Sequence, residues 1–187
     1  LNAAGINAGN LNSIGFNITN LNTSITSYPN FNISIGCSGQ STFTSLSDET
    51  SLITGLTNVY SSPSVNISLG LNTYNFTQAY AWDGTSNLIV DVCFEVPGTF
   101  SYTSNAEVSC TSTSNYSALT ITSDSDPTCV ISSGAFYGTY PTQMRPVATF
   151  GWCSSTANAS MYSFNLNPNT SIIPAGSGIT TPTTSLQ

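Results

Sequence analysis

The titratable side chains of this chain limit the chemistry that it can perform. Its 187 residues include no His and a single basic residue, Arg145, against eight Asp and Glu residues, for a net charge of -7. Without His, neither a His-containing catalytic triad nor a His-ligated zinc site can be assembled. Ser is abundant, but no His or Lys is present to activate a Ser nucleophile. We therefore predict a protein that is not an enzyme.

Carboxylates offer one metal-binding alternative. The stretch 124–127 places Asp124, Asp126 and a hydroxyl in one loop, and calcium is bound by about six to eight oxygens. The stretch lacks the spacing of an EF-hand and also fits an ordinary turn, so these two residues are a weak calcium candidate and no other cofactor is expected. Asp48 and Glu49 are interpreted as a solvated loop. A glycosidase needs two carboxylates that face each other across a cleft, and nothing in the sequence places such a pair.

Arg145 is the only positive side chain that can meet an anion. Its fork-shaped guanidinium is expected to pair with Asp91, Glu95 or Glu107, and a ligand carboxylate is the minor alternative. Nucleic acids and anionic membranes attract clustered Lys and Arg, so both are excluded as partners. No apolar run reaches the 18 or so residues of a membrane-spanning helix, so membrane insertion is not expected.

Three aromatic residues are candidates for ligand contacts. Trp82 lies beside a turn predicted at 83–87, and we expect it in the core, with stacking on a sugar as the alternative. Tyr137 and Tyr140 flank a Gly in another loop and could also present rings to a glycan.

The five cysteines indicate an oxidising environment. They form no CxxC pair, so disulfides are favoured over a zinc site. A bond between Cys110 and Cys129 would stabilise the fold by about 3 kcal/mol. Because the number of cysteines is odd, at least one thiol is either free or bonded to another chain. A buried free Cys and a bond to another chain are equally favoured. The disulfide candidates are Cys37, Cys93, Cys110, Cys129 and Cys153.

Sequons for N-glycosylation are frequent, although Asn, Ser and Thr are so abundant that chance explains most of them. Four lie on the polar phase of alternating segments, where a glycan would leave the core undisturbed. The candidates are Asn17, Asn22, Asn32, Asn66, Asn75, Asn115, Asn158 and Asn169.

Alternation of apolar and polar residues recurs along the chain, and helical periodicity does not. Half-buried strands are predicted where apolar residues occupy every second position, at 14–18, 31–35, 65–69 and 74–76. The more continuously apolar segment 88–94 is predicted to be a central strand, and 147–152 the strand that closes the core. The expected fold is all-β, a two-sheet antiparallel β-sandwich of jelly-roll or immunoglobulin-like kind.

The chain divides into two parts at Cys153. Residues 1–153 are predicted to form the sandwich, and residues 154–187 a strand-like segment followed by a Pro-, Ser- and Thr-rich tail or linker. The alternating residues Tyr162, Phe164 and Leu166 could cover an edge of their own domain, which is the commoner arrangement, or extend a sheet of a neighbouring subunit.

An ordered series of motifs resembles a β-sandwich module of secreted surface proteins of Bacteroidetes, the large adhesins and type IX secretion substrates. The resemblance spans residues 1 to about 153 and implies surface display rather than any defined activity. In that family a further strand usually precedes the segment that matches 1–5, so we expect this chain to come from something longer. The motifs are the segments 5–18, 55–60, 72–76 and 82–94, and the dipeptide 145–146.

These observations favour a secreted, non-enzymatic module at the cell surface. Only 5% of the residues are charged, and weak repulsion between like charges lets copies of one subunit approach closely. We expect a subunit of an adhesin or self-assembling fibre whose partners are its own copies or neighbouring modules. Uncharged surfaces also occur in ordinary secreted proteins, and a carbohydrate-binding module of a multidomain protein is the alternative.

Overall fold

The computed structural model describes residues 7–21, 27–43, 55–95, 105–121, 139–154, 171–172 and 183–184. Every regular element within these ranges is a β-strand, so the prediction of an all-β chain is confirmed. Four long strands come first, and strands of seven residues or fewer follow. The strands are β1 (Gly9–Asn20), β2 (Ser27–Ser38), β3 (Thr57–Asn66), β4 (Gly70–Trp82), β5 (Asn87–Cys93), β6 (Glu107–Val108), β7 (Cys110–Ser112), β8 (Ala118–Ile121), β9 (Thr139–Thr142), β10 (Met144–Pro146), β11 (Ala148–Ser154), β12 (Ser171–Ile172) and β13 (Thr183–Thr184).

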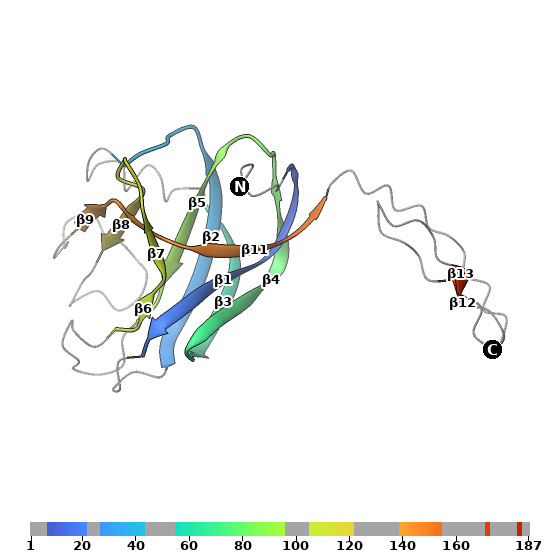
Figure 1. Ribbon diagram of the computed structural model, residues 1–187, viewed down its shortest axis with the longest axis horizontal. Coiled ribbons are helices and arrows are strands. Elements are labelled where there is room, and N and C mark those ends of the chain that lie inside the picture. Colours follow the sequence, from blue (N-terminus) through green and yellow to red (C-terminus); the bar gives the residue numbers. More distant parts are fainter. Residues whose placement is uncertain are drawn as a thin grey trace.

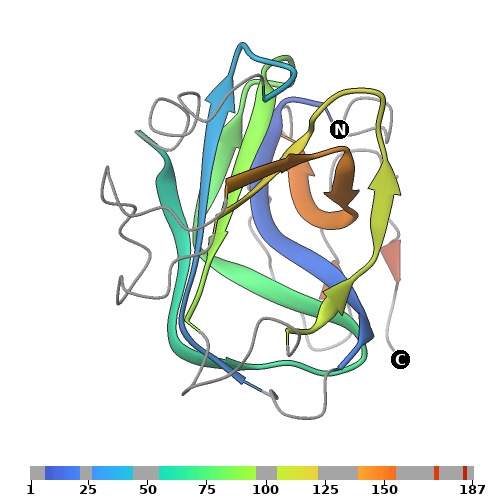
Figure 2. The ribbon, with the colours of Figure 1, turned by 90° about the vertical axis from the view of Figure 1, so that its left-hand side faces the viewer.

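The described strands pair in an antiparallel manner and form several separate sheets. The first sheet has the order β11–β1–β4, and β6 pairs with the end of β1. The second sheet has the order β3–β2–β5. Three small ladders join β7 with β10, β8 with β9, and β12 with β13. Figure 1 shows β1 and β11 drawn across β2 and β5, and Figure 2 shows the same strands after a quarter turn.

The alternating residues of the two sheets meet in one buried cluster. Ile14 of β1 and Ile33 and Ile35 of β2 are 0% exposed, and Val59 of β3 and Tyr74 of β4 belong to the same cluster. Burial of one such aliphatic side chain contributes about 1.5–3 kcal/mol. The strands predicted at 14–18, 31–35 and 74–76 are therefore confirmed, because their alternation places one face of each strand in this cluster.

Aromatic rings extend the cluster across three strands. Phe31 of β2 stacks on Tyr74 of β4 with 4.9 Å between ring centroids, and it meets Tyr60 of β3 edge-on at 6.2 Å. Offset stacking and edge contacts are the favoured arrangements for such pairs. Burial raises the pKa of the Tyr74 phenol, and the phenols of Tyr60 and Tyr28 add to this shift. The rings thus link the second sheet to β4 of the first.

One side of the molecule is closed where β3 meets β4. The pairing of β4 with β1 shifts between Leu11 and Ser13, because Leu11 faces Tyr80 whereas Ser13 faces Asn75. The residues of β4 in between bulge away from β1 and turn to β3. Thr77 Oγ1 donates a hydrogen bond to the carbonyl of Val59 (3.1 Å), and Gln78 Nε2 donates one to the carbonyl of Asn58 (3.1 Å). These side chains satisfy carbonyls that the sheet leaves unpaired at β3.

The prediction of a strand at 65–69 is wrong for the residues after Asn66. Val65 and Ile67 are buried as expected, but β3 stops at Asn66 and Leu69 is 63% exposed. The Asn72 side chain forms a turn here, because its Oδ1 accepts from the Ser68 amide (3.0 Å) and its Nδ2 donates to the Ser68 carbonyl (2.7 Å). Gly70 has a φ of 90°, which favours glycine. Local hydrogen bonds to the backbone therefore overrule the alternation.

The prediction of a central strand at 88–94 is also wrong. Among the described strands β5 pairs with β2 alone, so it stands at the end of its sheet. Leu88, Val90 and Val92 pack against the buried cluster, and all residues of β5 after Asn87 are half-buried. The continuous apolar run reflects a pocket beside this strand, described below, rather than a second neighbouring strand.

The predicted turn at 83–87 is confirmed. Asp83 Oδ1 accepts hydrogen bonds from the amides of Thr85 and Ser86, both 2.7 Å long, and Gly84 has a φ of 81°. These bonds hold the pKa of the Asp83 carboxyl at about 2, with the Ser86 hydroxyl as the largest cause. The turn carries the chain from β4 in the first sheet to β5 in the second.

Substitutions at buried and at exposed positions of the alternation are expected to change the free energy of unfolding by different amounts. Ile33→Ala should lower the free energy of unfolding by about 2–5 kcal/mol, because the 0% exposed side chain leaves a cavity between the sheets. Leu69→Ala removes a side chain that is 63% exposed and should change it by no more than about 0.5 kcal/mol. Urea denaturation measures both, and equal losses would contradict this core.

The Asp83 turn predicts a dependence of stability on acid. Because the pKa of Asp83 is lowered from 3.8 to about 2, its ionised form stabilises the fold above pH 4, and this contribution is lost as the pH falls toward 2. Asp83→Asn keeps an oxygen acceptor for the turn amides but cannot titrate. The melting temperature of the wild type should therefore fall more steeply between pH 4 and pH 2 than that of Asp83→Asn, and parallel curves would refute the effect.

Candidate ligand pocket

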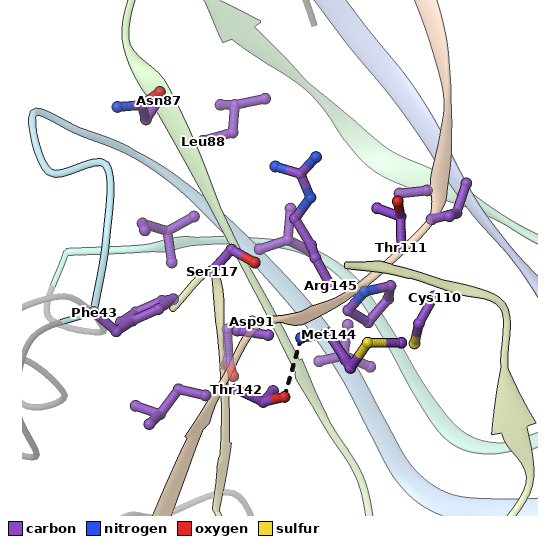
Figure 3. Close-up of a pocket in the computed structure, with 18 of the residues that line it drawn as sticks. Phe43, Asn87, Leu88, Asp91, Cys110, Thr111, Ser117, Thr142, Met144 and Arg145 are labelled. Carbon is purple, nitrogen blue, oxygen red and sulfur yellow. Dashed lines mark hydrogen bonds between the residues drawn. The ribbon is translucent and has the colours of Figure 1, made fainter. Parts of the chain in front are cut away.

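A pocket of about 890 Å³ lies beside β5. Its wall is made by β5, by β10 with the segment 110–120, and by the loop 40–43, while inward residues of β1 and β11 line its base. The volume lies within the range of about 300–1,000 Å³ that ligand sites usually occupy. Figure 3 shows that the labelled side chains around it combine aliphatic and aromatic carbon with hydroxyl, amide, carboxyl and guanidinium groups.

The outer wall of the pocket is a two-stranded ribbon, defined as residues 110–121 and 139–146. Its two ladders, β7 with β10 and β8 with β9, are joined by hydrogen bonds around Thr113. The amide of Thr113 donates to the carbonyl of Gln143 (2.9 Å), and its hydroxyl lies 2.7 Å from the hydroxyl of Ser117. The amide of Ser117 donates to the carbonyl of Thr142 (3.0 Å). The ribbon is therefore continuous even where regular pairing is interrupted.

Backbone hydrogen bonds join the residues that flank the ribbon to the first sheet, and the ribbon itself to the loop that follows β2. Near the first sheet, the amide of Ser109 donates to the carbonyl of Asn17, and the amide of Val147 donates to the carbonyl of Ser109, each at 2.8 Å. Near the second sheet, the amide of Phe43 donates to the carbonyl of Tyr116 (2.9 Å). The contact between β3 and β4 lies at one end of the two sheets. The ribbon lies at the other end, where it covers the space beside β5.

Arg145 lines this pocket from β10. It is exposed, and it lies directly opposite Thr111 of β7, so the two side chains share one face of the ribbon. The predicted pairing with Asp91, Glu95 or Glu107 is wrong, since Arg145 forms no ion pair within the described part of the chain. Its side chain points away from that of Asp91 (Figure 3), Glu95 accepts from Asn30 Nδ2 (2.7 Å), and Glu107 lies in β6 opposite Asn20.

Asp91 is the charged group of the pocket wall on β5. Partial burial raises the pKa of this carboxyl, because removal of water disfavours its ionised form. No described cation neutralises it, since the chain's single Arg points elsewhere. In its protonated form a carboxyl can donate as well as accept hydrogen bonds.

Of the three aromatic ligand candidates, Trp82 is the one whose side chain is described, and it lines the pocket. Trp82 is 5% exposed and its ring Nε1 donates to the carbonyl of Ser86 (2.9 Å), so the prediction that it belongs to the core is confirmed and it has little surface for a sugar. Tyr140 is placed in β9 opposite Thr120, but its side chain is not described. Tyr137 lies outside the described residues, as do the calcium candidates Asp124 and Asp126 and the loop residues Asp48 and Glu49.

The structure corrects the cysteine pairing. Cys110 is a free, exposed thiol, so the predicted bond between Cys110 and Cys129 is wrong. Cys110 begins β7 within the ribbon, where its Sγ lies 3.5 Å from the carbonyl of Val108. Cys37 and Cys153 are also free and exposed, whereas Cys93 is disulfide-bonded. Cys129 lies outside the described residues.

The described sequons differ in accessibility. Asn17, Asn66, Asn75 and Asn115 are exposed and Asn32 is half-buried, which leaves their glycosylation a prediction. Asn22, Asn158 and Asn169 lie outside the described residues, as do Tyr162, Phe164 and Leu166 of the predicted second part. The division at Cys153 also stays a prediction, and the strands described beyond it, β12 and β13, pair with each other.

The pocket itself was not predicted from sequence. Its contributors come from separate segments, and residues such as Phe43, Thr111 and Met144 carry no motif. The available signal was the run 88–94, whose apolar residues on both faces require cover on both sides. The single Arg was the other signal, because the only basic side chain in a chain of net charge -7 is expected to pair with a specific anion.

The chain matches no protein-family model, no curated protein and no solved structure. The described residues contain no group of three or more His, Cys, Asp or Glu side chains that could hold a metal ion. They also contain no helix long and apolar enough to cross a membrane.

The raised pKa of Asp91 predicts that stability falls as the pH rises. Its folded-state pKa lies above the usual 3.8, so the folded protein keeps a proton that the unfolded chain has released, and stability is lost from about pH 4 up to the folded pKa. Asp91→Asn should remove this loss and unfold at a higher urea concentration than the wild type at pH 7. Near pH 3.5 the two proteins should be much closer, and a wild type that is more stable than Asp91→Asn at pH 7 would contradict the assignment.

Proposed function

We propose that this protein is a non-enzymatic extracellular module, a β-sandwich subunit of a cell-surface adhesin or self-assembling fibre. The fold supports the sandwich, because buried residues of the β11–β1–β4 sheet and of the β3–β2–β5 sheet pack into one cluster. The choice between a jelly-roll and an immunoglobulin-like topology is left open by this packing. The extracellular assignment rests on composition and on the resemblance to secreted surface modules.

The observation that carries the assembly proposal is the scarcity of charge in the strands that form the two sheet orders β11–β1–β4 and β3–β2–β5. Asp91 is the single charged residue in β1, β2, β3, β4, β5 and β11. On the outward face of the first sheet, Thr73, Gly15 and Thr149 occupy one row across three strands, and Leu71 beside them is 57% exposed. A face of small, uncharged residues has no like charges to repel an identical copy.

The edge of β11 adds a second support. Within the described residues β11 pairs with β1 alone, and its sequence Ala148–Ser154 contains neither Lys nor Pro nor any charge. Natural proteins usually protect an open edge with such residues, because unpaired backbone groups invite another strand. We infer that the β11 edge and the outward face next to it form the contact between subunits.

Electron microscopy and mass photometry of the purified chain test this proposal. The wild type should form regular fibres or oligomers at micromolar concentration. Thr149→Lys, which places a charge on the exposed outward face of β11, should reduce the assembled fraction at least tenfold. Ser61→Lys on the exposed outward side of β3 changes the net charge equally and should leave assembly intact. A wild type that stays monomeric would overturn the proposal, as would equal losses in both variants.

A further inference from the structure

The only basic side chain of the chain, Arg145, lines the pocket, and no carboxylate of the described residues pairs with it. Seven other acids accompany Asp91 in the sequence, yet the structure gives Arg145 no ion pair in its described part, and its side chain is exposed at the ribbon. Arg commonly binds planar anions through two parallel N–H donors. A lone guanidinium that lines a pocket of about 890 Å³ therefore identifies an anion as part of the ligand.

The backbone around Arg145 holds it in place before any ligand arrives. Its neighbour Met144 donates its amide to Thr142 Oγ1 (3.0 Å), and Pro146 pairs with Cys110 across the ladder. The next amide, that of Val147, is bonded to the carbonyl of Ser109. Arg145 is thus carried by a segment that is bonded on both sides, so binding costs little ordering of the backbone.

The other groups of the pocket suit a molecule rich in hydroxyls. Thr142 Oγ1 accepts from a backbone amide and still has its own hydrogen to donate, and Thr111 shares a face with Arg145. Asn87 and Ser117 add an amide and a hydroxyl at the wall. The lining also includes apolar surface, such as the Phe43 ring and the half-exposed Met144, and such surface suits the C–H faces of a sugar ring.

The charge of the site favours a carboxylate over a phosphate. The pocket holds one guanidinium, its other charged side chain is the acid Asp91, and no second cation exists in the chain to balance a dianion. The net charge of -7 repels polyanions as a whole. A single carboxylate on a polyhydroxylated ring meets both conditions.

We propose that the pocket formed by β5 and the ribbon binds a carboxylated sugar, a hexuronate alone or at the end of a glycan, with Arg145 pairing to its carboxylate and the hydroxyl and amide groups of the wall binding its ring. This site uses other faces than the assembly surface. The outward face of the first sheet and the β11 edge contribute to subunit contacts, whereas inward residues of β11 line the base of the pocket and the ribbon forms its outer wall. Binding by the monomer would therefore stand even if the chain never forms fibres.

Isothermal titration of the full chain, diluted until mass photometry shows monomers, tests this site with glucuronic acid, glucose and glucose 6-phosphate. The wild type should bind glucuronic acid at least tenfold more tightly than glucose, and the affinity should fall with added salt. Arg145→Gln should lose at least tenfold in affinity for glucuronic acid, and Arg145→Lys should recover only part of it because an ammonium cannot pair in the bidentate manner. Ser61→Asp changes the net charge by the same amount at an exposed site on β3 and should bind like the wild type.

Several outcomes would overturn the assignment. Equal affinity for glucuronic acid and glucose would remove the anion from the ligand, and tighter binding of glucose 6-phosphate would replace the carboxylate by a phosphate. Unchanged binding by Arg145→Gln would place the site elsewhere. Because Arg145 is exposed, the variant should fold, and an unaltered melting temperature confirms that any loss of affinity is local.

Discussion

The rest of the structure depends on the buried cluster that joins the two sheets. Each strand of these sheets carries apolar residues on one face, and none of the sheets can bury that face alone. Ile33 and Ile35 of β2 are fully buried because Ile14 of β1 and Val59 of β3 lie in the same cluster. The cluster fixes which face of each strand is outward, and so it decides where the uncharged rows and the pocket can lie.

The two sheets meet through β3 and β4 at one end, whereas the ribbon lies beside β5 at the other end. The pocket is found at this second end. Where β3 meets β4, the side chains of Thr77 and Gln78 donate hydrogen bonds to carbonyls of β3. At β5 no strand of the described chain pairs with the free edge, and the ribbon lies beside it instead. Backbone bonds at Ser109 and at Tyr116 hold the two ends of this wall, and the pocket lies between the ribbon and β5.

Much of the fold was predictable because burial and alternation agree over most of the long strands. Ile14, Ile18 and Phe31 lie where the alternation places them, and the 83–87 turn follows from the ability of Asp83 to bind its own backbone. Leu69 and β5 were mispredicted because a side-chain turn and a neighbouring pocket, rather than strand pairing, decide their environments. Prediction of the pocket would have required knowledge of contacts between residues more than 20 positions apart, such as Thr113 and Gln143. No local sequence pattern contains this information.

The scarcity of charge gives the single Arg an influence that it would not have in an ordinary protein. In a chain with many cations, a surface guanidinium competes with others for the same anion and contributes little. Here the net charge of -7 repels anions, and Arg145 is the one side chain whose charge attracts them. The same scarcity leaves the strand faces free of repulsion. One compositional bias can therefore support both contact between copies and selection of a singly charged ligand, and the two surfaces stay separate because the ribbon keeps Arg145 away from the uncharged rows of the first sheet.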